Sequence, residues 1–101
     1  MALQKNRRYN NTDVGYWKVS GLNISYTGKV AQIYVIGFAN EEERIEGIEN
    51  KIAFENYICK GKDFEKYFAI DKLNSDGINP IVNSYNFLKD EIGLFIDSID
   101  I

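Results

Sequence analysis

Residues 16–38 constrain the fold most, because they contain two strand patterns separated by a short turn. In residues 16–26 apolar and polar side chains alternate, and the alternation slips by one residue at Gly21, which predicts a β-bulge there. The letters "YTGK" follow, and we expect Gly28 to take a positive-φ position in the turn. Residues 30–38 continue as a second strand, so the stretch predicts a β-hairpin.

The second predicted strand is apolar on both faces. One face carries Val30, Tyr34, Ile36 and Phe38, and the other carries Ala31, Ile33 and Val35. A hairpin alone buries too little surface to be stable in water. We therefore expect the rest of the chain, or another chain, to cover it.

Weaker patterns predict the elements that follow. In the charged connection 40–50, Asn40 and Glu43 have the spacing of a helix N-cap and its capping box. Residues 51–59 alternate as a third strand, whereas residues 64–70 fit a strand or a short helix equally well. One face of the third strand carries Ile52, Phe54 and Ile58, and the other carries Ala53, Tyr57 and Cys59.

The clearest helix spans residues 80–92. Asn79 is its expected cap, and Pro80 stands at the first helical position. One face should pack on the sheet, because apolar residues recur at helical spacing. These residues are Ile81, Tyr85, Leu88 and Ile92. Gly93 ends the helix, and the apolar tail "LFIDSIDI" fits a short strand or a docking segment.

Together these elements predict an α+β fold: a small antiparallel sheet built on an N-terminal β-hairpin, with one C-terminal amphipathic helix packed on it. We expect residues 1–101 to form a single domain, because the chain is too short for two cores. Residues 1–13 are expected to be a flexible or extended N-terminal arm. Cys59 lies in an apolar run and is interpreted as a small buried hydrophobe.

Composition limits the partners. No apolar run approaches the roughly 18 residues that cross a bilayer, and the first fifteen residues lack the apolar core of a secretory signal. We therefore expect a cytosolic protein with no membrane partner.

Charge is distributed unevenly along the chain. Residues 1–38 hold five basic groups and one acidic group, and residues 39–101 hold seven basic and fourteen acidic groups. Either copies or neighbouring subunits meet head to tail through these opposite charges, or folding interleaves both signs. Nucleic acid is not expected, because the basic residues are few and scattered.

No pattern for catalysis or metal binding is complete. The chain has no His, which excludes Ser-His-Asp and Cys-His sites and most catalytic zinc sites. "KLNSDG" resembles part of a calcium loop, but Lys72 and Asn83 stand where carboxylates are required, so we interpret "DKLNSDG" as a turn. The consecutive Glu41, Glu42 and Glu43 are expected to form a solvated edge rather than a catalytic pair. We expect no enzyme activity, no cofactor and no metal.

Aromatic side chains crowd the predicted hairpin, and they form either its core or a platform for a sugar, a peptide or a neighbouring subunit. With the apolar residues of the tail they make up the candidate interaction surface. Its members are Tyr16, Trp17, Tyr26, Tyr34, Phe38, Phe95, Ile99 and Ile101.

Two stretches carry a resemblance to known proteins. The first, "GYWKVSGLNISYTGKVAQIYVIGFANEEER", opens with Tyr-Trp-Lys and includes a strand ending in Gly and an aromatic, then a short Asn-Glu-Glu connection. The second is "SYNFLKDEIGLFIDSIDI" at the end of the chain. Together they resemble small proteins of about this length from the late tail, baseplate or fibre gene region of phages and prophages of Gram-positive bacteria. The resemblance covers about half of the chain and includes no catalytic signature.

The resemblance implies a structural or assembly protein of a phage tail, baseplate or fibre that acts by protein–protein packing. Its partners would be tail or fibre proteins, copies of itself, or both. It would be found in the virion tail after synthesis in the bacterial host cytoplasm. Two alternatives stay open: a small phage-encoded inhibitor of a host enzyme or defence complex, and a carbohydrate-binding module that uses Trp17 and nearby tyrosines.

Overall fold

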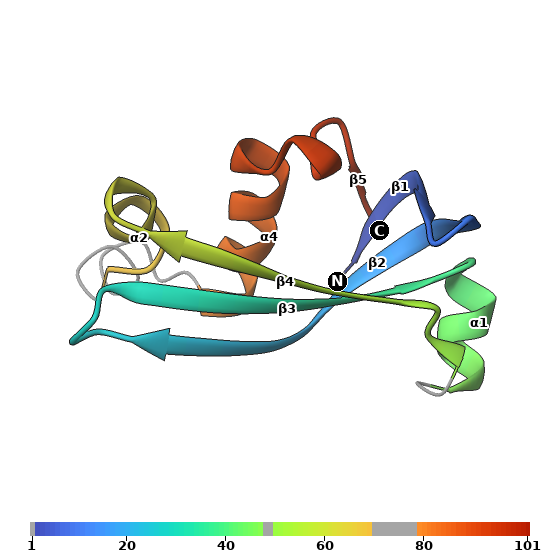
Figure 1. The fold of residues 1–101 in the computed structure, drawn as a ribbon, viewed down its shortest axis with the longest axis horizontal. Helices are drawn as coiled ribbons and strands as arrows, with labels where there is room; N and C mark the ends of the chain where they lie inside the picture. Colours follow the sequence, from blue (N-terminus) through green and yellow to red (C-terminus); the bar gives the residue numbers. More distant parts are fainter. Residues whose placement is uncertain (1, 48–49, 70–78) are drawn as a thin grey trace.

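A computed structural model describes residues 2–47, 50–69 and 79–101. Within them a twisted five-stranded antiparallel sheet carries helices α2 and α4 on one face, which confirms the α+β class (Figure 1). The strands are β1 (Leu3–Tyr9), β2 (Thr12–Ser25), β3 (Val30–Phe38), β4 (Ala53–Lys60) and β5 (Ile99–Asp100). The helices are α1 (Glu41–Glu46), α2 (Lys62–Tyr67), α4 (Pro80–Glu91) and the short 3-10 helix η2 (Gly93–Phe95).

The predicted hairpin is the β2–β3 pair, at the centre of the strand order β4-β3-β2-β1-β5. Its register moves from Val19 opposite Val35 to Gly21 opposite Tyr34, which confirms the predicted bulge. The turn prediction was wrong in one detail, because Lys29 and not Gly28 has the positive φ, at 52°. The left-handed residue is therefore the last of the turn, directly before β3.

The N-terminal residues and the helices depart from the simpler predicted plan. Residues 3–9 are extended, but they lie inside the sheet as β1, between β2 and β5, and do not stand out as an arm. The expected single packed helix is joined by α2, which settles the undecided 64–70 segment as helical up to Tyr67. The turn predicted over "DKLNSDG", residues 71–77, lies outside the described residues.

The predicted caps are present. The Asn40 side chain accepts a hydrogen bond from the Glu43 N–H at 3.0 Å and begins α1. The Asn79 side chain accepts from the Ile81 N–H at 2.7 Å and begins α4, with Pro80 at its first position. Each cap satisfies a backbone donor that the first helical turn leaves free. No helix in the described ranges is long and apolar enough to cross a membrane.

Helix α4 buries a broader face than its apolar spacing predicts. Tyr85 and Leu88 are buried as expected, but Ile81 is 37% exposed. The buried face is broader than predicted because α2 lies beside α4. The Asn83 amide donates to the Tyr67 carbonyl at 2.8 Å, and the centres of the Tyr67 and Phe87 rings lie 5.6 Å apart. The face toward α2 is therefore buried as well.

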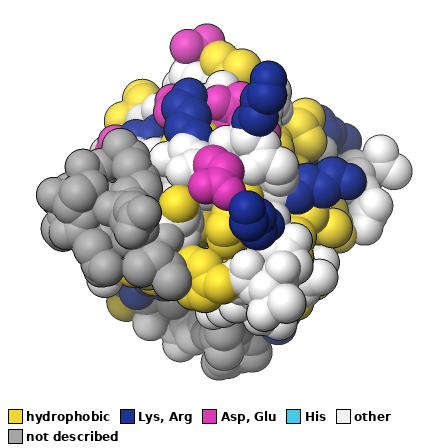
Figure 2. Space-filling view, turned by 90° about the vertical axis from the view of Figure 1, so that its left-hand side faces the viewer, with side chains coloured by type: hydrophobic (Ala, Val, Ile, Leu, Met, Phe, Trp, Pro, Cys, Tyr) yellow, Lys and Arg dark blue, Asp and Glu magenta, His cyan; other side chains and the backbone are white. Residues whose placement is uncertain are grey.

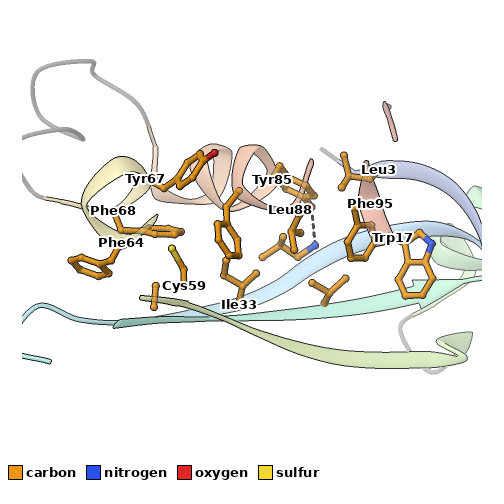
Figure 3. Close-up of a cluster of buried hydrophobic side chains, with 14 of the residues drawn as sticks. Leu3, Trp17, Ile33, Cys59, Phe64, Tyr67, Phe68, Tyr85, Leu88 and Phe95 are labelled. Atoms are coloured by element: carbon orange, nitrogen blue, oxygen red, sulfur yellow. Dashed lines mark hydrogen bonds between the residues drawn. The ribbon is translucent and has the colours of Figure 1, made fainter. Parts of the chain in front are cut away.

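The core lies between the sheet and the layer formed by α2, α4 and η2 (Figure 3). Tyr85 connects the two layers, because its hydroxyl accepts a hydrogen bond from the Val19 N–H at 2.9 Å, beside the bulge. Cys59 has no exposed surface and belongs to this core, which confirms its interpretation as a buried hydrophobe. Its thiol has a pKa raised to about 12, first because of burial and then because of nearby carboxylates.

Candidate interaction surfaces

The structure separates the eight residues predicted as an interaction surface. Four of them are at most 5% exposed and belong to the core: Tyr16, Trp17, Phe38 and Phe95. Tyr34 is half-buried, and three are exposed: Tyr26, Ile99 and Ile101. For the four buried residues the prediction of a surface was wrong, and the alternative reading of the hairpin aromatics as core applies to Tyr16, Trp17 and Phe38.

Trp17 is buried because segments from both ends of the chain cover it. Its indole N–H donates to the Lys5 carbonyl at 2.9 Å, and its ring lies edge-on to Phe95 at 5.4 Å. The guanidinium of Arg7 lies 4.4 Å from the centre of the same ring. Such contacts combine cation–π attraction with apolar packing and leave no ring face for a ligand.

A polar cluster joins β1 to β4 on the face that the helices cover. The Arg7 guanidinium donates through both Nη atoms to the two carboxylate oxygens of Glu55, at 2.8 and 2.9 Å. The Tyr57 hydroxyl donates to Glu55 Oε1 at 2.7 Å. A two-armed arrangement of this kind is among the stronger hydrogen-bonded ion pairs in proteins.

The pKa values in this cluster follow from its contacts. Burial by itself would raise the pKa of Glu55, but hydrogen bonds from Arg7 and Tyr57 and the Arg7 charge hold it below its ordinary value. Burial and the bond to the Glu55 carboxylate raise the pKa of Tyr57. A general acid requires a raised carboxyl pKa, so Glu55 is placed for structure and not for proton transfer. Among the described residues no three His, Cys, Asp or Glu side chains gather as a metal-binding group.

The sheet face opposite α2 and α4 forms the first exposed apolar surface. We call it the back face and define it by the outward side chains of β3, of β4 with the preceding Ile52, and of residues 16–25 in β2. Ile52, Phe54 and Ile58 are 38%, 50% and 53% exposed on it. The rings of Phe54 and Tyr34 stack with their centres 6.2 Å apart. Because β4 is an outermost strand of the sheet, no further strand shields these side chains.

The back face is basic. The strand register places Lys18 and Lys60 on it and no carboxylate. A hollow of about 320 Å³ opens beside Lys18, between the strands and α1. Arg44 of α1 lines this hollow, and its Nε is buried with no hydrogen-bond partner among the described residues. A buried donor without an acceptor is energetically costly, so this position favours an incoming acceptor.

The second exposed apolar surface is the tail segment, residues 94–101. Phe95 anchors it in the core, and the Ile101 N–H donates to the Ala2 carbonyl at 3.0 Å. Four other side chains are between 44% and 60% exposed: Leu94, Ile96, Ile99 and Ile101. The segment contains Asp97 and Asp100, and two lysines lie against it: Lys5 donates to the Ile96 carbonyl at 2.7 Å, and Lys89 contacts Asp100 at 2.8 Å.

In the folded protein, ion pairs neutralise part of the charge asymmetry between the two parts of the sequence. Arg7 contacts Glu55, and Lys29 contacts Glu65 at 3.4 Å, so basic groups of the first 38 residues meet acids of the remainder. Figure 2 shows Lys or Arg side chains interspersed with Asp or Glu at the end of the molecule that carries α2. Lys5 and Lys18 differ, because within the described part of the chain neither makes an ion pair.

Sequence reasoning noticed that Ile52, Phe54 and Ile58 share one face of a strand, but it did not single them out as a site. The alternation of these residues predicts a strand, but it does not predict that this strand lies at the edge of the sheet. Comparisons with known protein families, with curated proteins and with solved structures found no match. The function is therefore inferred from the two exposed apolar surfaces.

Proposed function

We propose that the protein is a structural or assembly component of a phage or phage-like particle, in its tail, baseplate or fibre region, and that it acts by packing against other polypeptides. The exposed row of Ile52, Phe54 and Ile58 on the back face carries this proposal. Grouped apolar side chains at a sheet edge are a liability for a monomer and are typical of binding surfaces. The phage context comes from the resemblance of the two sequence stretches.

Burial of this row would supply the driving force. Each square ångström of apolar surface removed from water contributes about 25 cal/mol. Association itself has a large entropic cost, and repeated copies held in register reduce that cost for each further contact. The partners are tail or fibre proteins, copies of the chain, or both, and the working location is the virion tail.

The other two functions expected from the sequence differ in their support. Trp17 has no exposed surface, so it cannot stack on a sugar, and the carbohydrate-binding alternative loses the residue on which it rested. An inhibitor of a host enzyme or defence complex would use the same exposed back face. Its distinguishing property is location, because an inhibitor stays unassembled in the host cell.

Mass spectrometry of washed particles tests the proposal. The wild-type protein is expected in the particles in stoichiometric amounts. A variant with Phe54→Ser and Ile58→Ser is expected to fold and to be lost from the particles. The control Lys62→Ser, which changes an exposed side chain of α2, is expected to be retained. Absence of the wild-type protein from washed particles would overturn the placement, and its capture on a host enzyme would favour the inhibitor.

A further inference from the structure

We infer that the hollow between the sheet and α1 binds the C-terminal carboxylate of a partner polypeptide whose last residues are apolar. This inference rests on the proposed function, because it takes the partner to be a polypeptide, and it names the chemistry that recognises that partner. Its starting point is a pair of cations, Lys18 and Arg44, that line the hollow without a counterion among the described residues.

Arg44 supplies the more specific half of the site. Its Nε is buried and has no hydrogen-bond partner in the described part of the chain. The guanidinium lies over the Tyr16 ring, 5.7 Å from its centre, so the ring covers one side of it and gives it no acceptor. A guanidinium can donate from Nε and from the adjacent Nη in parallel, and this edge matches the two oxygens of a carboxylate. A bound carboxylate would therefore satisfy a donor that is costly to leave buried.

Lys18 supplies the second positive charge, and no acid close by offsets it. No carboxylate is among the side chains that line the hollow. Glu41 and Glu42, the exposed acids nearest in sequence on α1, line separate hollows. Two cations that share a recess with no acid give it a positive potential, which favours an anionic ligand.

The strand register connects this hollow to the exposed apolar row of the back face. Lys18 lies opposite Ile36 in the β2–β3 pair, and Ile36 lies opposite Phe54 in the β3–β4 pair. Neighbouring strands are about 4.8 Å apart, so Lys18 and Phe54 are on strands roughly 10 Å apart. Phe54, at the far end of this line, is 50% exposed. About three extended residues span the same distance, so a short peptide can contact the cations and Phe54 together.

The end of a polypeptide suits this line more closely than an acidic side chain within a chain does. In a C-terminal residue the carboxylate and the side chain are attached to the same carbon atom. The carboxylate can therefore meet Arg44 while an apolar side chain lies at the floor of the hollow, formed by Ile36 and Phe38. The preceding residues then cover part of the exposed Phe54 ring and remove apolar surface from water. An internal Asp or Glu carries its carboxylate away from the main chain and leaves the apolar contact to another residue.

Peptide titrations followed by nuclear magnetic resonance of isotope-labelled protein test the inference. The probe is acetyl-Ala-Leu-Leu with a free carboxyl end. One control peptide has the same sequence with an amidated end and carries no charge. A second, acetyl-Leu-Asp-Leu-amide, carries its one carboxylate on an internal side chain. The titrations follow the Nε–Hε signal of Arg44 and the main-chain amide signals of Lys18 and Ile36.

The free-acid peptide is expected to shift all three signals in a saturable manner. Each control peptide should bind more weakly by about tenfold or more, because the charge-assisted hydrogen bonds to Arg44 are lost or misplaced. Arg44→Lys keeps the charge but lacks the Nε edge, and it should weaken binding of the free-acid peptide by a similar factor. Lys62→Gln, a change at an exposed side chain of α2, is the matched control and should leave binding unchanged.

Three results would overturn the inference: no saturable shift with the free-acid peptide, equal binding of either control peptide, or unchanged binding by Arg44→Lys. The amide spectrum shows whether each variant is folded. If Arg44→Lys is not folded, Lys18→Gln replaces it, and unchanged binding by that variant overturns the inference in the same way.

Particle mass spectrometry separates this inference from the proposed function. If the free-acid peptide does not bind but the wild-type protein is found in washed particles, the proposed function stands and the inference fails. If the peptide binds as expected but the protein is absent from the particles, the hollow binds the chain end of another partner and the placement in the particle fails.

Discussion

Arg7 and Glu55, 48 positions apart in sequence, form a two-armed ion pair that joins β1 to β4 across the sheet. Two strands, β2 and β3, lie between them in the strand order, so the pair holds the sheet in its curved shape. The Arg7 and Glu55 side chains are only 11% and 17% exposed. An ion pair this enclosed matters for stability mainly through what remains when one member is removed.

We predict that Glu55→Gln lowers the free energy of unfolding by on the order of 3 kcal/mol, because it leaves the enclosed Arg7 charge without a counterion. Urea unfolding followed by tryptophan fluorescence measures the change, since Trp17 lies against Arg7. The double variant Arg7→Met, Glu55→Leu should be destabilised by less than the sum of the effects of the single variants Arg7→Met and Glu55→Leu. Strict additivity in this cycle would show that the two residues are not coupled.

The same pair predicts how stability depends on pH. The pKa of Glu55 is lower in the folded protein than its ordinary value of 4.5. At pH values between these two, the unfolded chain therefore binds more protons than the folded protein. The contribution of Glu55 is complete above that ordinary value and is lost as pH falls through the lowered pKa of the folded state. Unfolding free energies of the wild type and Glu55→Gln should therefore converge as the solution is acidified below pH 4.5. A constant difference down to the acid limit would contradict the assignment.

Gly37→Ala should be strongly destabilising. A Cβ at this position would lie 2.6 Å from Val14 Cγ1 and 3.0 Å from the Trp17 ring, closer than packed atoms approach. Relief of this overlap should cost about 2 kcal/mol. Gly93→Ala is the matched control, because a Cβ there meets no atom within 4 Å, and its effect should stay within about 0.5 kcal/mol. Equal melting temperatures of the two variants would mean that β3 does not approach Trp17 as described.

Cys59 should be inert toward thiol reagents in the folded protein. It has no exposed surface, and its thiol has a pKa of about 12, so the reactive thiolate is scarce at pH 8. Labelling should follow the unfolding transition in urea. A thiol introduced by Thr27→Cys, in the exposed β2–β3 turn, should react at once without denaturant. Rapid labelling of Cys59 in native buffer would place it outside the core.

Local signals in the sequence predicted the local structure well. The bulge beside Gly21 follows from a slipped alternation, and the caps at Asn40 and Asn79 follow from residue spacing. These features depend on residues within one element, so one segment contains all the information. Helix α2 could not be decided in this way, because six residues are too few for either periodicity to dominate.

Relations between distant segments could not be predicted. The burial of Trp17 depends on Phe95 and Lys5, which come from the tail and from β1. The exposure of Phe54 depends on β4 being last in the strand order. Neither the contacts of Trp17 nor the position of β4 can be predicted from the residue pattern of its own strand. For this reason half of the predicted surface residues lie in the core, and the back face was not predicted.

The central claim is that the back face packs against another polypeptide, and photo-crosslinking in particle-producing cells tests it most directly. The photoreactive residue p-benzoylphenylalanine replaces Ile58 on the back face or, as a control, the exposed Lys62 of α2. Position 58 is expected to give a discrete protein adduct, while position 62 gives none. If position 58 yields no more adduct than position 62, the back face is not a binding surface and the account fails.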